Sequence, residues 1–318
     1  MSGIDILGTG CYAPSHTLSN DDLSTMVDTS DEWIYPRTGI KKRHISQTEN
    51  TSELAYQAAK KALENSGVSK EDIGFIIVAT CSADHIMPSV ACMLQKQLGL
   101  SEQVMAFDMN AACTGFVYAL SIANAMLATR PDKLALVIGA EVFSKMLDYT
   151  DRSTCILFGD GAGAVVARHN PNARFYEVIS SRGDVEAVHI HIPGVPFADH
   201  QEPSYCKMNG QEVFKFAVKQ VPECIKEVLE ETGNTAEDID QFIIHQANYR
   251  IIESIAKRLK VDLEKFPVNM EHYGNTSGAS VPILLDELNR AGKLKNGDKL
   301  VLAGFGAGLT WGAVLLEW

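Results

Sequence analysis

An internal repeat constrains the fold of this 318-residue chain more than any other feature of its sequence. The triplet Glu71-Asp72-Ile73 opens the apolar run EDIGFIIVAT, and the same triplet opens EDIDQFIIHQ 166 residues later, at Glu237. A second triplet, Asp132-Lys133-Leu134, opens DKLALVIGA and returns at the same displacement, at Asp298. Because two matches share one offset and each leads into an apolar strand, the sequence predicts two similar halves.

Each predicted half pairs a helix with a buried strand. The helical patterns are SELAYQAAKKALENSG and EVFKFAVKQVPECIKEVLEETG, and a glycine ends each of them. Helices that alternate with continuous apolar strands predict an α/β fold with largely parallel, doubly covered sheets. We place the connection in RHNPNAR, which divides the chain into residues 1–170 and 171–318. The alternative is one large α/β domain in which the shared offset is coincidental.

Composition and charge exclude several classes of protein. Hydrophobic residues make up 46% and charged residues 21%, as in an ordinary globular protein. Purely apolar stretches such as LALVIGA are far shorter than the roughly 20 residues that span a membrane. The N-terminal sequence shows no export signal, so we expect a cytoplasmic protein. A net charge of −12 argues against nucleic-acid binding. Seven cysteines without CxxC spacing argue against a disulfide framework or a zinc site.

Cys113 is the candidate nucleophile. It lies in FDMNAACTGFVYALSIANAML, where an extended segment gives way to a helix of small and apolar residues. The positive end of a helix dipole favours the thiolate, which is the nucleophilic form of cysteine. Its neighbours Ala111, Ala112 and Gly115 leave space for a substrate beside the sulfur. The alternative is a buried and inert cysteine, which is the commoner state of this residue.

His245 is the candidate histidine. It lies in QFIIHQANYRIIESIAKRL, where an apolar strand ends and an amphipathic helix follows. Functional groups of open α/β sheets gather beyond the carboxyl ends of strands. Its counterpart at the 166-residue offset is Ala79, so only one half carries the imidazole. A hydrogen-bonded core histidine is the alternative.

Asn275 belongs to HYGNTSGASVP, a glycine-flanked polar turn that precedes the predicted helix VPILLDELNR. Such a turn can hold an amide rigidly, although ordinary turn and capping chemistry explains it equally well. His272, three residues earlier, could be mistaken for a partner of this amide.

Two glycine-rich stretches, at 158–166 and 304–312, do not match nucleotide-binding fingerprints. Close backbone packing is the expected role of both, and the second leaves backbone N–H groups free to face a reacting oxygen. His189 and His191 share a strand face but have no third ligand, so we predict no metal site.

With these residues in context, the chain resembles the β-ketoacyl-acyl-carrier-protein synthase III family of thiolase-like condensing enzymes. The resemblance covers essentially the whole length. Its motifs stand in the family's order and spacing: DTSDEWIYPRTGI, AACTGF, FGDGAGA, HQANYRI, HYGNTSGASVP and GFGAGLTWG. It implies a duplicated five-layer α/β fold and a homodimer.

The resemblance also implies a catalytic triad. Cys113 would accept an acyl group from acyl-coenzyme A. His245 and Asn275 would hydrogen-bond the malonyl thioester carbonyl and stabilise the enolate that forms as carbon dioxide leaves. The backbone N–H groups of Cys113 and Ala307 would form the oxyanion hole for acyl transfer. Relatives commonly have glycine at the position of Ala307.

Substrate contacts follow from the same resemblance, and it implies no separate cofactor because acyl-coenzyme A and malonyl carrier protein are both substrates. Trp33 and Arg152 would flank the adenine, and Arg37 would lie near the phosphates. The pantetheine tunnel would be lined by Gly210, Phe214, Ala217 and Asn248. The carrier-protein surface would comprise Gln246, Ala247, Asn248, Tyr249, Arg250, Lys215, Lys257 and Arg258. A solvated helix face is the alternative explanation for those basic residues.

One departure from the family concerns Met87 in ADHIMPSVAC. Many relatives have phenylalanine at this position, which reaches the acyl pocket of the partner subunit. Methionine is narrower and more adaptable. We therefore expect acyl chains longer than acetyl to be accepted.

Three other functions compete with this interpretation. The first is a related acyl-coenzyme A-dependent condensing enzyme or acyltransferase of secondary metabolism. The second is a thiolase, which would need another cysteine near GFGAGLTWG, and that stretch has none. The third is a non-catalytic module that binds carrier protein, against which the intact set of Cys113, His245 and Asn275 argues.

Overall fold

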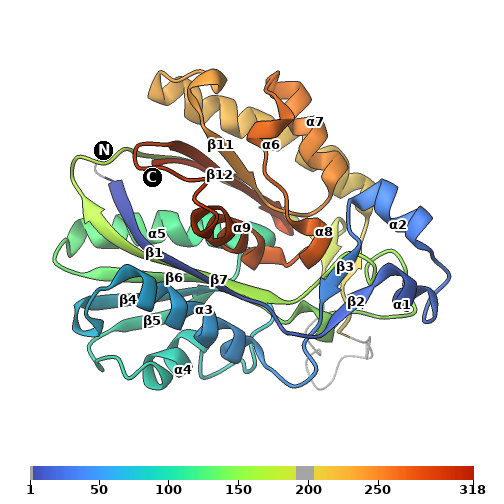
Figure 1. Ribbon diagram of the computed structural model, residues 1–318, viewed down its shortest axis with the longest axis horizontal. Coiled ribbons are helices and arrows are strands. Elements are labelled where there is room, and N and C mark those ends of the chain that lie inside the picture. Colours follow the sequence, from blue (N-terminus) through green and yellow to red (C-terminus); the bar gives the residue numbers. More distant parts are fainter. Residues whose placement is uncertain (1–2, 191–203) are drawn as a thin grey trace.

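Two β-sheets form the framework of the computed structural model, which describes residues 3–190 and 204–318 (Figure 1). The first sheet has the order β1-β7-β6-β4-β5. Its strands are β1 (Gly3–Tyr12), β4 (Ile73–Ala79), β5 (Met105–Met109), β6 (Leu134–Glu141) and β7 (Gly161–Asn170). The second sheet has the order β11-β12-β13-β8. Its strands are β8 (Phe175–Asp184), β11 (Gln241–Ile244), β12 (Lys299–Gly306) and β13 (Gly308–Glu317).

The two sheets repeat one topology, because β1-β7-β6-β4 corresponds strand for strand to β8-β13-β12-β11. Both sheets are mixed. β4 pairs in parallel with β5 and β6, and β11 with β12, whereas every pairing of β7 and β13 is antiparallel. The α/β prediction is confirmed, but the expectation of largely parallel sheets is wrong. The reason is that β7 and β13 enter each sheet from the opposite direction, which the strand sequences do not reveal.

The repeat extends to the connections before the matched strands. Helix α3 (Thr51–Ser66) ends at Gly67 and helix α6 (Gly210–Thr232) ends at Gly233, and both glycines adopt the left-handed conformation. Short 3-10 helices follow at Lys70–Asp72 and Ala236–Asp238, which keep the 166-residue offset seen in the sequence. The predicted division after residue 170 lies between the end of β7 and the start of β8, and it stays a prediction.

Five layers stack through the molecule (Figure 1). Helices α3 and α4 (Val90–Gln97) cover the outer face of the first sheet. Helices α5 (Gly115–Thr129) and α9 (Ser280–Arg290) pack between the two sheets. Helices α6 and α7 (Tyr249–Leu259) cover the outer face of the second sheet. This is the five-layer, thiolase-like arrangement, and each apolar helix face is buried against a sheet.

The remaining elements are short, and four of the strands form two small sheets, β2-β3 and β9-β10. They are β2 (Thr17–Ser19), α1 (Asn20–Ser24), α2 (Asp31–Thr38), β3 (Lys42–His44), β9 (Val188–His189), β10 (Lys207–Met208), α8 (Met270–Tyr273) and 3-10 turns at Ala112–Thr114, Phe143–Met146, Leu263–Lys265 and Ser277–Ala279.

One helical stretch, Ala112–Thr129, is long and apolar enough to cross a membrane by length and composition, and 44% of it is buried within the chain. Its apolar character has a structural explanation, because α5 packs in the central layer against both sheets. Ser121 and Asn124 interrupt this stretch, so it is not a purely apolar run in the sequence.

Candidate active site

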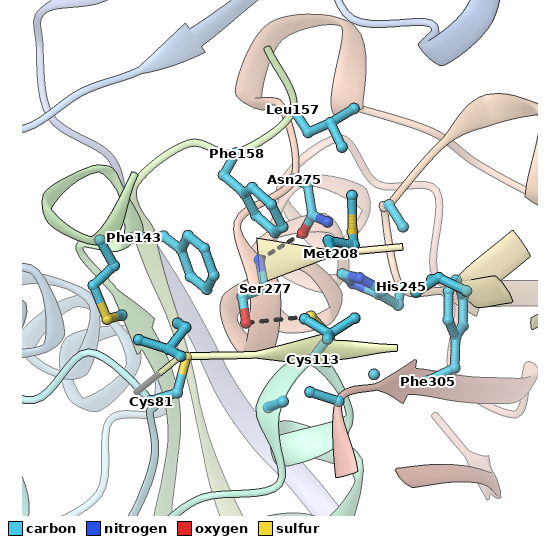
Figure 2. Close-up of a pocket in the computed structure, with 18 of the residues that line it drawn as sticks. Cys81, Cys113, Phe143, Leu157, Phe158, Met208, His245, Asn275, Ser277 and Phe305 are labelled. Carbon is cyan, nitrogen blue, oxygen red and sulfur yellow. Dashed lines mark hydrogen bonds between the residues drawn. The ribbon is translucent and has the colours of Figure 1, made fainter. Parts of the chain in front are cut away.

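A cavity of about 510 Å³ opens where the two halves meet, and Cys113, His245 and Asn275 all line it (Figure 2). These residues come from three distant stretches of chain. Most of the wall is apolar, and includes Phe143, Leu157, Phe158, Val188, Met208, Val213, Phe214, Ile251 and Phe305. The cavity therefore suits a long, mainly apolar ligand with a few polar groups at its inner end.

Two equivalent turns form the inner end of this cavity. Cys113 lies in the 3-10 turn before α5, and Ser277–Ala279 forms the corresponding turn before α9. Ala112 and Ser277 open these turns with positive φ angles of 47° and 49°. The turns touch, since a side chain at Gly278 would meet the carbonyl oxygen of Ala112 at 3.2 Å. The N-termini of both central helices thus meet at the site.

The thiol of Cys113 donates a hydrogen bond to the Ser277 hydroxyl at 3.4 Å. Burial raises the pKa of this thiol to about 12, and the hydrogen bond to Ser277 lowers it only in part. The expectation of a stabilised thiolate is therefore wrong for the free site. The reason is that an enclosed, mostly apolar cavity disfavours charge more than one helix N-terminus favours it.

The imidazole of His245 is buried at the end of β11, as the strand-end argument predicted. Its Nδ1 lies 2.7 Å from the Ser280 hydroxyl, and its ring and that of Phe305 form a T-shaped pair. Desolvation lowers the pKa of His245 to about 3. The group is therefore neutral at physiological pH and acts as a hydrogen-bonding group rather than as a cation.

The amide of Asn275 is held by the turn that carries it. Its Oδ1 accepts a hydrogen bond from the Ser277 N–H at 2.8 Å, which leaves the NH₂ group as the free end (Figure 2). Its backbone is bonded in both directions to the first half, to the carbonyl of Leu157 and from the N–H of Gly159. The neighbouring His272 is outside the cavity lining.

The second glycine-rich loop packs directly against Cys113. A side chain at Gly306 would meet the backbone nitrogen of Cys113 at 2.8 Å, and Ala307 lines the cavity beside it. The first loop packs similarly, since a side chain at Gly163 would meet Ile283 N at 2.6 Å. Close backbone packing is thus confirmed for both glycine-rich stretches.

Three polar residues at the inner end were not among the predicted site residues: Cys81, Glu141 and Ser277. Cys81 lines the cavity just beyond β4 (Figure 2). Glu141 is fully buried behind it, bonded by Ser82 and Cys81, and desolvation raises the pKa of its carboxyl. The first half has a strand end equivalent to that at His245, because Ala79 corresponds to His245. Cys81 lies two residues after this strand end, so the same argument could have identified it.

The predicted coenzyme A residues fall into two groups. Gly210, Phe214 and Asn248 line the cavity, but Ala217 does not. Ala217 is fully buried in the core of the second half, so the predicted contact is wrong for this structure. Ala217 lies two turns along α6 from Gly210, where the helix no longer forms the cavity wall and packs against its sheet instead.

Trp33, Arg37 and Arg152 lie together on the surface, away from the cavity lining. The guanidinium carbon of Arg37 is 4.7 Å from the Trp33 ring centroid, and that of Arg152 is 5.2 Å from it. Arg152 also donates to the carbonyl of Asp28. Since Arg152 contacts the ring directly, a base can stack between the two only after Arg152 swings away.

The predicted carrier-protein residues also divide. Gln246 is buried, and its amide bonds the Ile244 carbonyl and the Asn269 N–H, so a surface role for its side chain is wrong. Ala247 and Asn248 line the cavity. Tyr249 is half-buried against Gly39. Four basic side chains are exposed: Lys215, Arg250, Lys257 and Arg258.

Two further predictions concern single positions. Met87 is 82% exposed and is not among the described residues that line the cavity of its own chain. His191 of the histidine pair lies outside the described residues. Among those that are described, no group of three or more His, Cys, Asp or Glu side chains is placed to hold a metal ion.

Comparisons with known proteins agree on one family. The sequence family described as 3-oxoacyl-[acyl-carrier-protein] synthase III matches residues 107–183, and its C-terminal family matches residues 229–318. The beta-ketoacyl-[acyl-carrier-protein] synthase III of Clostridium acetobutylicum is 48% identical over the whole chain and 99% of its own length.

Solved structures give the same result. The 3-oxoacyl-[acyl-carrier-protein] synthase III of Aquifex aeolicus is 45% identical with a TM-score of 0.93, over 99% of this chain and all of that one. The priming beta-ketosynthase of the R1128 polyketide pathway is 34% identical with a TM-score of 0.92, over 99% of this chain and 96% of that one.

Proposed function

Because the chain belongs to the 3-oxoacyl-[acyl-carrier-protein] synthase III family, we propose that Cys113 carries the acyl group and that His245 and Asn275 promote the condensation. The chain is an acyltransferase-type condensing enzyme of fatty acid synthesis. One observation supports the assignment of roles above all others: these three side chains line the inner end of a single cavity between the halves.

In the loading step, the Cys113 sulfur attacks the carbonyl carbon of an acyl-coenzyme A thioester. The carbon–sulfur bond to coenzyme A breaks, and the departing coenzyme A sulfur takes the thiol proton. Backbone N–H groups of Cys113 and Ala307 are the proposed donors to the oxyanion. Burial raises the pKa of the Cys113 thiol to about 12, so the thiol holds its proton in the free site and must lose it as the sulfur attacks.

In the condensation step, a malonyl thioester loses carbon dioxide and leaves an enolate. The neutral imidazole of His245 and the amide of Asn275 stabilise its oxygen by donating hydrogen bonds. Neither is an acid strong enough to protonate the carbon nucleophile. The enolate carbon attacks the acyl-Cys113 carbonyl, and the bond from that carbon to the Cys113 sulfur breaks. The product is a 3-oxoacyl thioester, and the released Cys113 thiolate takes a proton from water to restore the thiol. Both substrates are thioesters that supply the reacting carbons, so we propose no separate cofactor.

Coenzyme A is proposed to enter along Gly210, Phe214 and Asn248, with its adenine on Trp33. In the free protein the Arg152 guanidinium lies over the Trp33 ring, in the place proposed for the adenine. Planar guanidinium and indole groups both stack on bases, so Arg152 can cover the adenine once it has swung aside.

A basic face on α7 is the proposed dock for the carrier protein. Arg250, Lys257 and Arg258 are exposed along this helix, and Asn248 at its N-terminus lines the cavity. The protein as a whole is acidic, with a net charge of −12, so a local basic surface is needed to attract an acidic partner.

The test compares malonyl carrier protein with malonyl-coenzyme A as second substrate. Charge reversal in a Lys257→Glu/Arg258→Glu variant should raise the KM for malonyl carrier protein about tenfold at low salt, because rim charges steer encounter. The reaction with malonyl-coenzyme A should be unchanged. Lys226→Glu, an exposed change on α6, is the matched control. Equal loss with both malonyl donors would contradict the docking role, and a preference for malonyl-coenzyme A would favour the secondary-metabolism alternative.

A homodimer is the proposed assembly. Strand β5 ends the first sheet, and its outer edge pairs with no strand of the described residues. Ile86, Met87 and Met105 are large apolar side chains exposed in the same half. Unpaired edges and exposed apolar side chains together favour association with a second copy. A molar mass twice that of the chain, by light scattering, checks this.

All seven cysteines are free, which suits the reducing cytoplasm that we propose as its location.

Met87 is proposed to reach the partner's acyl pocket and to permit chains longer than acetyl. In an acyl-coenzyme A series, we expect turnover of C4 or longer starters, and Met87→Phe should shift the preference toward acetyl by about tenfold, since an aromatic ring fills more of a pocket. Met26→Phe, an exposed methionine outside the proposed dimer contact, is the control. Turnover restricted to acetyl-coenzyme A in the unaltered enzyme would contradict this role.

A further inference from the structure

The hydroxyl of Ser280 contacts the catalytic imidazole and a backbone amide at the same time. Its Oγ lies 2.7 Å from His245 Nδ1 and accepts a hydrogen bond from the Gln246 N–H at 3.3 Å. Ser280 is only 2% exposed, at the first turn of α9. A buried hydroxyl in this position needs a partner for its own proton.

These contacts determine where the protons lie. One lone pair of the Ser280 oxygen is used by the Gln246 N–H. Within residues 3–190 and 204–318, the imidazole Nδ1 is the one acceptor that the structure gives to the hydroxyl proton. The hydroxyl therefore donates to Nδ1, which must be the unprotonated nitrogen. The ring proton then lies on Nε2, the nitrogen on the far side of the ring from Ser280.

We infer that Ser280 is a positioning residue that holds His245 as its Nε2–H tautomer, so that the ring presents a donor to the developing enolate. This inference rests on the proposed role of His245 in condensation. In the opposite tautomer, Nε2 would offer a lone pair to a negative oxygen, and stabilisation would become repulsion.

The same short segment orients the second donor. The Ser277 N–H donates a hydrogen bond to the side-chain oxygen of Asn275, which leaves the NH₂ group of the amide available to donate. Residues 275–280 thus fix the polarity of both hydrogen-bond donors, one through a backbone amide and one through a hydroxyl. Phe305 packs edge-on against the imidazole and limits its rotation.

The direct test is nitrogen NMR of the free enzyme with ¹⁵N-labelled histidine, with the His245 signal assigned by its loss in His245→Asn. We expect a neutral ring with the proton on Nε2. In Ser280→Ala, part of the population should move to the Nδ1–H form. A proton on Nδ1 in the unaltered enzyme, or an unchanged tautomer in the variant, would overturn the inference.

Kinetics separate this inference from the proposed function. Ser280→Ala should slow decarboxylation of the malonyl thioester about 10- to 100-fold, because the donor is present in only part of the molecules. Acylation of Cys113 should persist, which shows that the fold and thiol are intact. Ser52→Ala, another buried serine, is the matched control and should change neither step. If His245→Ala itself left decarboxylation unchanged, the proposed function would fail whatever the tautomer.

Discussion

Cys113→Ala is expected to abolish covalent loading and to lower condensation by at least about 10⁴-fold, because removal of a nucleophile leaves only binding and oxyanion stabilisation. The measurement is the mass of the intact protein after treatment with acyl-coenzyme A, followed by peptide mapping. The unaltered enzyme should gain one acyl group on the peptide that contains Cys113.

The chain offers a sharp control for this experiment, since Cys81 lines the same cavity. Cys81→Ala should still gain the acyl group on Cys113. The two thiols differ in their surroundings: Cys81 packs against the buried carboxylate of Glu141, which together with burial holds the pKa of its thiol far above the usual range. If acylation remained in Cys113→Ala and disappeared in Cys81→Ala, Cys81 rather than Cys113 would be the acylated residue.

Asn275→Ala is expected to separate the two half-reactions. Loading of Cys113 should continue, whereas carbon dioxide release from malonyl carrier protein should fall about 10²- to 10³-fold, the usual cost of removing one donor to an oxyanion. In the unaltered enzyme the amide oxygen accepts a hydrogen bond from the Ser277 N–H, so only the NH₂ group is available to the substrate. The substitution therefore removes one hydrogen-bond donor from the substrate.

Asn289→Ala is the matched control for this variant. Its amide lies near the C-terminal end of α9 and donates to the Thr9 hydroxyl, and it is not among the described residues that line the cavity. It should leave both half-reactions close to those of the unaltered enzyme. Equal loss of loading and decarboxylation in Asn275→Ala would contradict a role confined to the enolate and would indicate a collapsed turn.

The sequence predicted the residues whose position depends on local pattern. His245 follows an apolar strand, Cys113 precedes an apolar helix, and Asn275 lies in a glycine-flanked turn, so each location could be inferred from its neighbours. The 166-residue offset predicted the paired strands because both copies keep the same helix end and the same 3-10 turn before the strand.

Properties that depend on contacts between distant segments were not predictable in this way. The pKa of Cys113 is set by an enclosed cavity whose walls come from both halves, and a helix N-terminus alone suggested the opposite direction. Gln246 was predicted to lie on the surface with Asn248, but its side chain points inward and accepts a hydrogen bond from the Asn269 N–H. Ala217 keeps the helical spacing of Phe214, yet the sheet has already covered that part of α6.

The touching turns before α5 and α9 have a consequence for how such an enzyme can arise. Cys113 belongs to one copy of the repeat, whereas His245, Asn275 and Ala307 belong to the other. Neither copy alone holds the proposed nucleophile together with the imidazole and the amide proposed to promote condensation, so the site exists only where the two copies of the repeat meet.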